Sequence, residues 1–349
     1  MDKLRLATVF SGIGAIEHAL HRMKKDFEIV LACDPDEFCK KTYFANFPLK
    51  EEAWVDYIQD VNGKKYKNVD LLVGGSPCQS FSLVGKRRGF SDERGNLFFD
   101  FVRVLKEIKP KYFIFENVKG ILSHDSGKTF EKIKKQLEAA KYNIKPKVLN
   151  AKDFGIPQNR ERLFVVGTRG RNTFEFPKEK KLKITMQDLL EDNPNAKYFL
   201  PEKGIKFVTD KKNLKKRYTQ INGDIALCQK RNQQFNWHGD FIDMNKYYLS
   251  DKVKKYVLAT GTKNFYSKAE TDLDIARPLL STMAKMHRAG IDNYITRGSK
   301  LRKLTPRECF RLMGFSDSFK IPVSDTQAYK QAGNSIVVDV LIAILKELI

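Results

Sequence analysis

The first half of the chain alternates short apolar runs with longer stretches in which apolar residues recur at helical spacing. The short runs predict strands at Leu4 to Phe10, Ile29 to Cys33, Leu71 to Gly74, Tyr112 to Phe115 and Leu163 to Val166. The longer stretches predict helices at Ala15 to Met23, Leu97 to Ile108 and Thr129 to Ala140. Because this alternation is typical of helices covering both faces of a sheet, we expect an α/β fold with a doubly wound, mixed but mostly parallel sheet.

The pattern changes at about residue 174. From there to about 302, lysine clusters such as Lys178 to Lys183 and Lys211 to Arg217 interrupt short β-like pieces that have no helical period. We therefore expect a second, smaller domain, irregular and rich in β-structure. The predicted division is a first domain at 1–173, the smaller domain at 174–302, and C-terminal helices at 303–349.

Helical signals return after the second domain. Thr305 and Glu308 have the spacing of a capping box, and Pro306 between them suits the first helical position. A helix is therefore expected to begin here and run through Leu312 to Gly314. A last helix is expected at Ile336 to Leu348, returning to the first domain.

Charge and cysteine content narrow the class of protein. The 349 residues include 64 Lys and Arg against 42 Asp and Glu, a formal charge of +22, which favours a polyanionic partner and nucleic acid first. A lysine-rich surface from a compositionally biased genome is the alternative. Five cysteines without a C-x-x-C pair argue against a disulfide framework or cysteine-based metal site, and with no signal peptide or long apolar run a cytoplasmic protein is expected.

One cysteine has the setting of a nucleophile. Cys78 follows the predicted strand Leu71 to Gly74 on a turn containing Gly75 and Pro77. Ligands of open α/β sheets bind at the carboxyl ends of strands, so a thiol there would meet the substrate. The remaining cysteines are expected to be small apolar fillers of the core: Cys33, Cys39, Cys228 and Cys309.

The first predicted strand leads into the turn Phe10-Ser11-Gly12-Ile13-Gly14. A dinucleotide-binding turn would have a third glycine at position 17, where Glu17 stands, and a carboxylate near a pyrophosphate is unfavourable. We therefore expect an adenosine cofactor without phosphates. Asp34, after the second strand, is placed to bind ribose hydroxyls, and Phe10 could face a cation, which together fit S-adenosylmethionine. The alternative for Asp34 is a cap or turn residue.

Two further groups carry charge near predicted strand ends. Glu116 follows the strand Tyr112 to Phe115, where partial burial would let its carboxyl hold a proton for transfer to a ring nitrogen. Arg160 and Arg162 occupy alternate positions before another strand and would point to one side, toward a carbonyl oxygen or phosphate. A surface ion-pair ladder with Glu161 is the alternative.

These motifs occur in the order found in DNA (cytosine-5) methyltransferases of the bacterial or phage restriction-modification type, which the chain resembles. The matching segments are Phe10 to Gly14, Ser76 to Gln79, Glu116 to Val118, Gln158 to Arg162 and Gln331 to Ser335. The resemblance covers nearly everything except about 174–275. Five ordered motifs at compatible spacing are specific, whereas any one alone would not be.

The resemblance implies a role for each matching position. Cys78 is similar to the nucleophile that adds to C6 of cytosine, Glu116 to the acid that holds N3, and Arg162 with Arg160 to the support of the O2 edge and the active-site loop. Residues 85–96 resemble a mobile loop that closes over DNA. Positions around the cofactor would be Phe10, Gly12, Ile13, Gly14, Asp34, Pro35, Asp60, Val61, Pro77, Leu97, Asn334 and Ser335.

Two positions depart from the family pattern. Pro35 stands where many members have a tryptophan against the adenine, which weakens the stacking there or leaves it to another ring. Leu279 replaces a threonine that contacts a phosphate in many members. The implied reaction needs the cytosine to be rotated out of the duplex, while the second domain grips the DNA.

Other functions stay open on the sequence. A tRNA cytosine-5 methyltransferase would share the chemistry, and a DNA-binding protein that has lost catalysis would share the charge. A zinc deaminase is disfavoured because Phe81 occupies the second cysteine position of its motif, and a thiol protease because none of the histidines has a recognisable setting. We expect a monomer that binds double-stranded DNA without a metal, with a separate restriction endonuclease as a possible companion.

Overall fold

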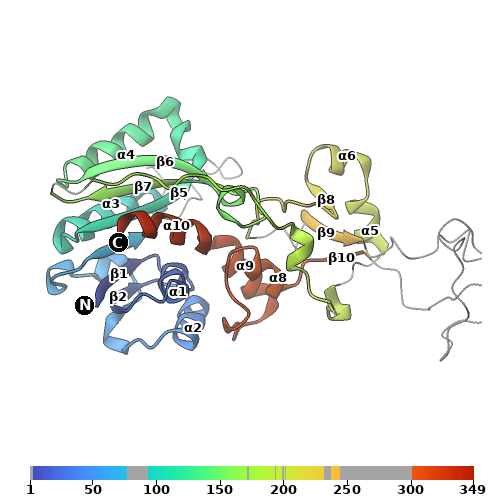
Figure 1. Cartoon of the computed structure of the whole chain (residues 1–349), viewed down its shortest axis with the longest axis horizontal. Coiled ribbons are helices and arrows are strands. Elements are labelled where there is room, and N and C mark those ends of the chain that lie inside the picture. Colours follow the sequence, from blue (N-terminus) through green and yellow to red (C-terminus); the bar gives the residue numbers. More distant parts are fainter. Residues whose placement is uncertain are drawn as a thin grey trace, which may run out of the picture.

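A seven-stranded sheet forms the centre of the larger body (Figure 1). The computed structural model describes residues 3–76, 93–170, 173–192, 194–198, 200, 202–231, 237–243 and 301–349. The strands are β1 (Leu4–Val9), β2 (Phe27–Cys33), β3 (Trp54–Val55), β4 (Leu71–Gly74), β5 (Tyr112–Val118), β6 (Asn143–Asn150) and β7 (Glu161–Thr168), in the order β3-β2-β1-β4-β5-β7-β6. Neighbouring strands pair in parallel from β3 through β2, β1 and β4 to β5. Strand β7 pairs antiparallel with both β5 and β6. The expected mixed, mostly parallel sheet is confirmed.

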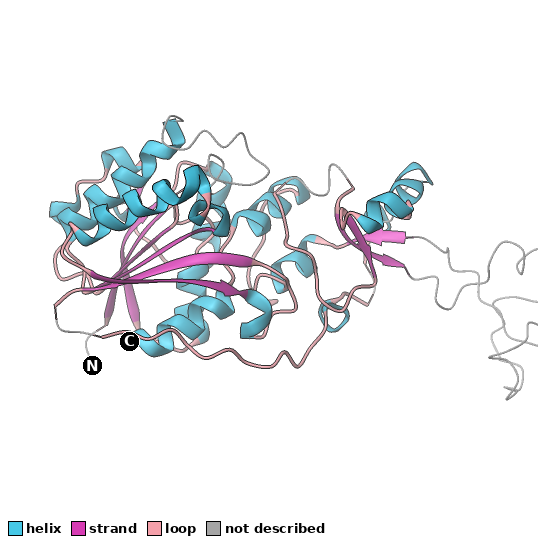
Figure 2. Ribbon diagram, turned by 90° about the horizontal axis from the view of Figure 1, so that it is seen from above, coloured by secondary structure: helices cyan, strands magenta, loops and turns pink. Residues whose placement is uncertain are grey.

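Helices cover both faces of the sheet, as the alternation of side chains requires. Leu4 and Leu6 of β1 pack into the layer that holds α1 and α10, whereas Ala7 and Val9 pack into the layer that holds α3 and α4. Figure 2 shows these helices on either side of the fanned strands. The helices of the body are α1 (Ala15–Arg22), α2 (Glu37–Asn46), α3 (Glu93–Ile108), α4 (Lys128–Glu138), α8 (Pro306–Arg311), α9 (Asp325–Asn334) and α10 (Val338–Leu348).

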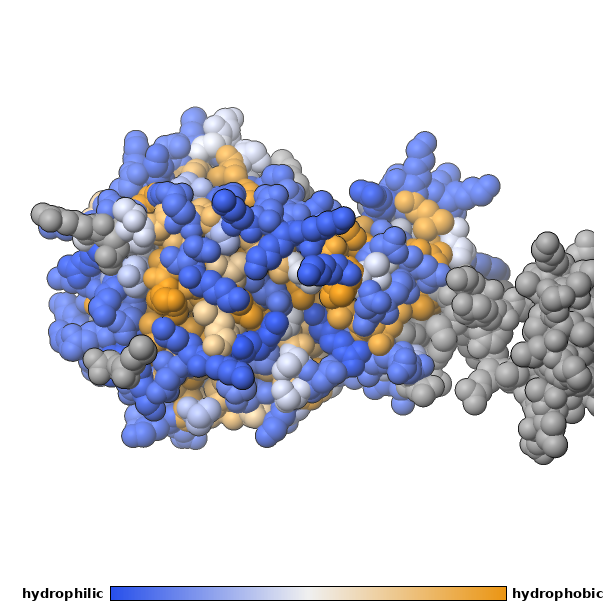
Figure 3. Space-filling model, in the orientation of Figure 1, coloured by the Kyte–Doolittle hydropathy of each residue, from blue (hydrophilic) through white to orange (hydrophobic). Residues whose placement is uncertain are grey.

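A second, three-stranded sheet lies beside the body, at the right of Figure 1. It consists of β8 (Thr219–Ile221), β9 (Gly239–Asp243) and β10 (Leu301–Lys303), next to α5 (Glu202–Val208) and α6 (Lys211–Lys215). A small cluster of Leu200, Val208 and Phe241 forms its core. Hydrophilic side chains cover much of the surface in Figure 3, including the projecting end of this smaller part.

Several helices and strands begin or end at residues other than the predicted ones. Strand β5 continues to Val118, so Glu116 lies within the strand rather than after it. Helix α3 begins at Glu93, so the last four residues of the loop expected at 85–96 are helical. Strand β1 ends at Val9, because Phe10 turns to a positive φ of 56°. Helix α8 has the expected capping box but ends at Arg311, before a left-handed Gly314.

The stretch Asp325–Leu348 is long and apolar enough to span a membrane by length and composition alone. It consists of two helices, α9 and α10, separated at Ser335 to Val337. Leu341, Ile344 and Leu345 of α10 are fully buried, and α10 packs against α1. This environment is that of a core helix and fits the expected return of the C-terminal segment to the first domain.

Candidate active site

The turn after β1 is built from left-handed backbone and one carboxylate. Gly12 has a φ of 55° and Gly14 a φ of 85°, conformations that favour glycine. Oδ2 of Asp34 accepts a hydrogen bond from the Gly12 amide at 2.8 Å, and its Oδ1 accepts one from the Asp36 amide at 3.0 Å. Asp34 thus holds the β1 turn against the turn after β2. This is the role of a turn residue, the alternative that the sequence left open for Asp34.

A cavity lies above this turn. Of the predicted cofactor residues, the structure brings Phe10, Gly12 and Ile13 together with Asn334 and Ser335 around this cavity. Asp34, Pro35, Asp60, Val61 and Leu97 are not among its lining residues. A Cβ added to Gly12 would meet nothing within 4 Å, so a ligand has a clear approach to that backbone. The described lining residues include no Lys or Arg, so none of them offers a side-chain cation to a phosphate.

Glu17 corrects the sequence argument about phosphates, which placed its carboxylate beside the ligand. The structure places Glu17 in the core, where its Oε1 accepts hydrogen bonds from the Tyr43 hydroxyl at 2.7 Å and from Thr8 Oγ1 at 3.1 Å. Burial raises the pKa of this carboxyl to about 7. Glu17 therefore stabilises the turn from below, and the preference for a cofactor without phosphates rests on the cavity lining instead.

Asp60 and Val61 lie in or next to a short 3-10 turn, Ile58–Asp60. Val61 is buried against α3, and its carbonyl oxygen accepts a hydrogen bond from Arg103 at 2.7 Å. The residues that directly follow β3 are Asp56 and the exposed Tyr57. Contacts of Asp60 and Val61 with a cofactor stay a prediction.

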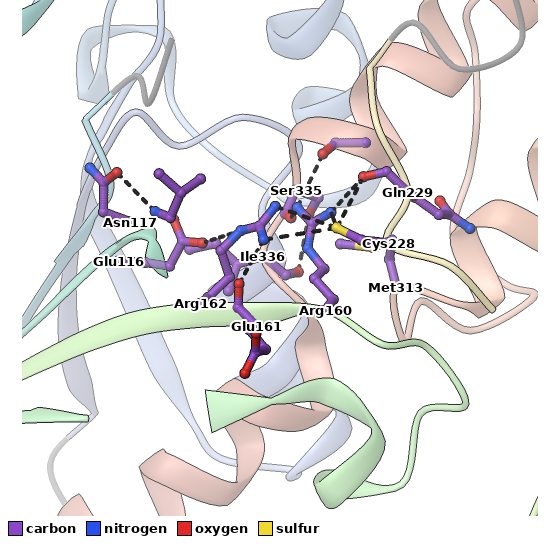
Figure 4. Close-up of polar contacts among 12 residues, drawn as sticks. Glu116, Asn117, Arg160, Glu161, Arg162, Cys228, Gln229, Met313, Ser335 and Ile336 are labelled. Atoms are coloured by element: carbon purple, nitrogen blue, oxygen red, sulfur yellow. Dashed lines mark hydrogen bonds and ion pairs between the residues drawn. The ribbon is translucent and has the colours of Figure 1, made fainter. Parts of the chain in front are cut away.

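Glu116 lies at one end of the charged part of the site, beside Arg162 (Figure 4). Its side chain is 15% exposed, and its Oε1 lies 3.3 Å from Nε of Arg162, which comes from the neighbouring strand β7. Burial raises the pKa of Glu116, while Arg162 and then Arg160 oppose that rise. The carboxyl can thus keep a proton at a higher pH than an exposed one.

The end of β4 packs directly against Glu116. A Cβ added to Gly75 would lie 2.8 Å from the Glu116 carbonyl oxygen and 3.0 Å from its Oε2, so only glycine allows this approach. Asn117 Nδ2 donates to the Ser76 carbonyl oxygen at 3.2 Å. Pro77 and Cys78 lie outside the described residues, as do residues 79–92 and the departure at Leu279.

The two arginines have different partners. Arg160, 3% exposed, donates to the carbonyl oxygens of Gln229 at 2.9 Å, Gly333 at 3.1 Å and Ser335 at 2.8 Å. It therefore joins the start of β7 to the wall of the cavity. Arg162 faces Glu116 and is half-buried, so the alternative of a surface ion-pair ladder with Glu161 does not describe this pair.

Cys228 is a residue whose surroundings the sequence did not reveal. Expected to be an apolar filler, it is half-buried, with its Sγ 3.8 Å from Arg160 Nη1 and 3.9 Å from Arg162 Nη1. Cys39, also expected to be a filler, lines the cavity above the β1 turn. Cys33 and Cys309 are buried, and the four described cysteines are free thiols.

Comparisons with known proteins agree on one family. The model of the family described as C-5 cytosine-specific DNA methylase matches residues 4–349. The type II methyltransferase M.SsoII of Shigella sonnei is 36% identical over 99% of this chain and 80% of its own length. The type II methyltransferase M.HhaI of Haemophilus parahaemolyticus is 35% identical over 97% of this chain and 92% of its own length.

Solved structures share the fold at lower identity. EhMeth of Entamoeba histolytica aligns with a TM-score of 0.69 and 20% identity over 100% of this chain and 98% of its own. DNMT2 of Spodoptera frugiperda aligns with a TM-score of 0.69 and 22% identity over 99% of each chain. These likenesses extend over the whole chain and concern its architecture.

Proposed function

The chain belongs to the C-5 cytosine-specific DNA methylase family as a DNA cytosine-5 methyltransferase, and from this premise we propose that it methylates a flipped-out cytosine in a specific duplex sequence through a covalent bond between Cys78 and C6. The cofactor in this proposal is S-adenosylmethionine. The likeness of the chain to type II methyltransferases supports a role in a restriction-modification system.

The observation that carries the proposal is the setting of Glu116. This carboxyl is mostly buried beside the guanidinium group of Arg162 and lies against Gly75 after β4, while the neighbouring Asn117 donates to the Ser76 carbonyl oxygen. Cys78 follows Ser76 by two positions in the sequence, so the nucleophile and the acid are supplied by neighbouring parallel strands. A base bound at this edge of the sheet would meet both groups.

In this proposal each residue has a distinct part. The Cys78 thiolate forms a bond to C6 while Glu116 donates its proton to N3, so the ring's electron pair becomes available at C5. After C5 has been methylated, the C5 proton is lost to solvent, its electron pair forms the C5=C6 double bond, and the bond to sulfur breaks so that Cys78 leaves as thiolate. N3 then returns its proton to Glu116. Arg162 supports the O2 edge, and Arg160 supports the site through its three carbonyl contacts.

The cavity above the β1 turn suits the proposed cofactor. Its described lining offers the open face of Gly12 and the ring of Phe10 and contains no cationic side chain. We assign cofactor contacts to the predicted set, among which Phe10, Gly12, Ile13, Asn334 and Ser335 surround this cavity. S-adenosylmethionine bound there supplies the methyl group as a sulfonium cation, which an aromatic face favours.

DNA is the substrate that the family implies, and the smaller sheet is proposed to grip it. Lys211, Lys212, Lys215 and Lys216 are concentrated on and beside α6, which suits phosphate contacts. We also propose domain limits at 173 and 302, a monomeric and cytoplasmic enzyme, and a separate partner endonuclease. The closing loop at 85–96, whose last four residues belong to α3, is likewise proposed, as is the recognition role of 174–302.

Methyl transfer from labelled S-adenosylmethionine tests the function directly. We expect incorporation into duplex DNA at a specific cytosine, identified by bisulfite sequencing, and none into tRNA. Replacement of Cys78 by serine should nearly abolish turnover, and an oligonucleotide containing 5-fluorocytosine should form an adduct at position 78. Label that enters tRNA but not DNA would contradict the proposal. So would a fluorinated oligonucleotide that binds the protein without forming a covalent adduct.

A further inference from the structure

A short segment of the chain connects the smaller sheet to the charged part of the site. In this segment, residues 226–229, the Leu227 amide donates to both carboxylate oxygens of Asp240 on β9, at 3.1 and 3.0 Å. The Gln229 amide donates to Gln158 Oε1 at 3.0 Å, and the Ala226 amide donates to the Pro157 carbonyl oxygen at 2.7 Å. Cys228 is therefore held from both sides, with its backbone fixed relative to the start of β7.

The sulfur of Cys228 completes a row of charged groups. Sγ lies 3.8 Å from Arg160 Nη1 and 3.9 Å from both Nη atoms of Arg162, while Nε of Arg162 lies 3.3 Å from Glu116 Oε1 (Figure 4). Arg162 is thus contacted on one side by a thiol and on the other by the carboxyl that the proposed function uses as its acid.

Positive charge is concentrated beside the sulfur. Arg162 pairs with the carboxyl of Glu116, and Arg160 donates to the carbonyl oxygens of Gln229, Gly333 and Ser335. Burial raises the pKa of the Cys228 thiol, but the charges of Arg160, Arg162 and Lys230 more than offset this, and the pKa falls below its ordinary value. The sulfur can therefore carry negative charge beside both arginines.

We propose that Cys228 is a positioning residue for the methylation reaction: its sulfur holds Arg162 against Glu116 and neutralises part of the arginine charge, so that Glu116 keeps its proton. This inference rests on the proposed function, in which the acid form of Glu116 holds N3 of the cytosine. It also means that the smaller sheet, through Asp240 and residues 226–229, fixes the geometry of the acid.

The sign of the effect follows from the charged groups around each residue. Cys228 faces Arg160, Arg162 and Lys230, and Glu116 faces Arg162 and Arg160. Without a negative sulfur, the arginine charge stabilises the Glu116 carboxylate more strongly, and the pKa of Glu116 falls. Since the reaction needs the protonated form, activity at alkaline pH must then be lost earlier.

The pH dependence of kcat for Cys228→Ala and Cys228→Ser provides the test. We expect the alkaline limb of both variants to move by about one pH unit toward lower pH, which lowers kcat about tenfold above both limbs. Serine keeps the size and a hydrogen-bonding group but does not ionise in this range. A serine variant with the wild-type profile overturns the proposal, and so do two unshifted variants. Cys309→Ala, which removes a buried thiol from α8, is the control and should show no shift.

Alkylation of Cys228 gives a second readout that needs no turnover. In a Cys78→Ser background, the rate of iodoacetamide modification at Cys228, followed by peptide mass spectrometry, should rise at a pH below the value of about 8.5 for a free thiol. Adding Arg162→Gln should move that rise to higher pH. If the wild-type protein methylates DNA, an ordinary thiol profile at Cys228 of the Cys78→Ser protein overturns this inference alone. If the wild-type protein does not methylate DNA, a shifted profile at Cys228 leaves this geometry standing and the proposed function alone is overturned.

Discussion

Two buried carboxyl groups lie at the carboxyl edge of the same sheet, and their surroundings differ in charge. Glu17, under the turn after β1, is fully buried and bound by the neutral hydroxyls of Tyr43 and Thr8, while its Oε2 has no hydrogen-bond partner in the described structure. Glu116, on β5, is 15% exposed and faces the guanidinium group of Arg162. Burial raises the pKa of both.

The difference separates a structural carboxyl from one that can exchange a proton with a ligand. Thr8 bonds Ser11, whose Oγ accepts from the Cys33 amide, so the network around Glu17 continues into backbone and fixes the turn. Glu116 instead faces the Arg162 cation, and its side chain is 15% exposed. Burial alone therefore does not mark the acid, because access to the site and a nearby opposite charge are also needed.

Glu116→Gln should break the site and leave the fold intact. The amide keeps the shape but cannot donate a proton to N3, so we expect kcat to fall by about 10²- to 10⁴-fold. Thermal unfolding should move little, because the amide oxygen can still accept from Arg162. Glu17→Gln is the matched control and should retain turnover. If Glu116→Gln kept more than about a tenth of the rate, the distinction between the two carboxyls would be wrong.

The two arginines extend the comparison to stability. Arg160→Ala leaves three carbonyl oxygens without their donor, and each unsatisfied buried group costs about 1–3 kcal/mol, so a loss of at least about 3 kcal/mol is expected in urea unfolding. The side chain of Arg162 is 19% exposed and pairs with Glu116, so Arg162→Ala should cost less, about 1–3 kcal/mol, while lowering turnover strongly. Equal losses of stability would show that the arginines do not divide these roles.

Glu17→Gln should change the pH dependence of stability. The pKa of Glu17 is about 7 in the folded protein against 4.5 ordinarily, so the folded state holds the extra proton between these values. Stability is therefore lost as pH rises from 4.5 to about 7, and the full cost of the buried charge is present above that. At about 1.4 kcal/mol per pKa unit this is about 3 kcal/mol. In urea unfolding at pH 8, the free energy of unfolding of the glutamine variant should exceed that of the wild type by up to that amount. The difference should disappear toward pH 5.

The sequence predicted the parts of the fold that have strong local signals. Strand β4 matches residue for residue, and Thr305 with Glu308 forms the expected capping box. Strand β6 was not predicted because its sequence, with Pro146 in the middle, is largely exposed and does not alternate clearly. Helix α9 was missed because polar residues interrupt its apolar positions.

The candidate site was predictable only where its residues stand in motifs. Glu116 and Arg162 were singled out, and the structure pairs them. The partners of Arg160 come from residues about 70 and 170 positions further along the chain, and no local pattern indicates such contacts. The same holds for Cys228, whose position between the arginines depends on the path of residues 226–229.

The smallest expected effect concerns two carboxylates beside the β1 turn. Asp36 caps α2 by accepting hydrogen bonds from the amides of Phe38 at 2.9 Å and Cys39 at 3.1 Å, so Asp36→Ala should lower stability by about 1 kcal/mol. Asp34 instead accepts from Gly12, which lines the cavity, so Asp34→Ala should also weaken binding of S-adenosylmethionine in calorimetry. Asp36→Ala should change that affinity less, because its carboxylate accepts from amides at the start of α2 rather than from the glycine turn. If both variants bound the cofactor equally well, the β1 turn would be shaped by its glycines alone, and Asp34 would join Glu17 among the carboxyls whose role is structural.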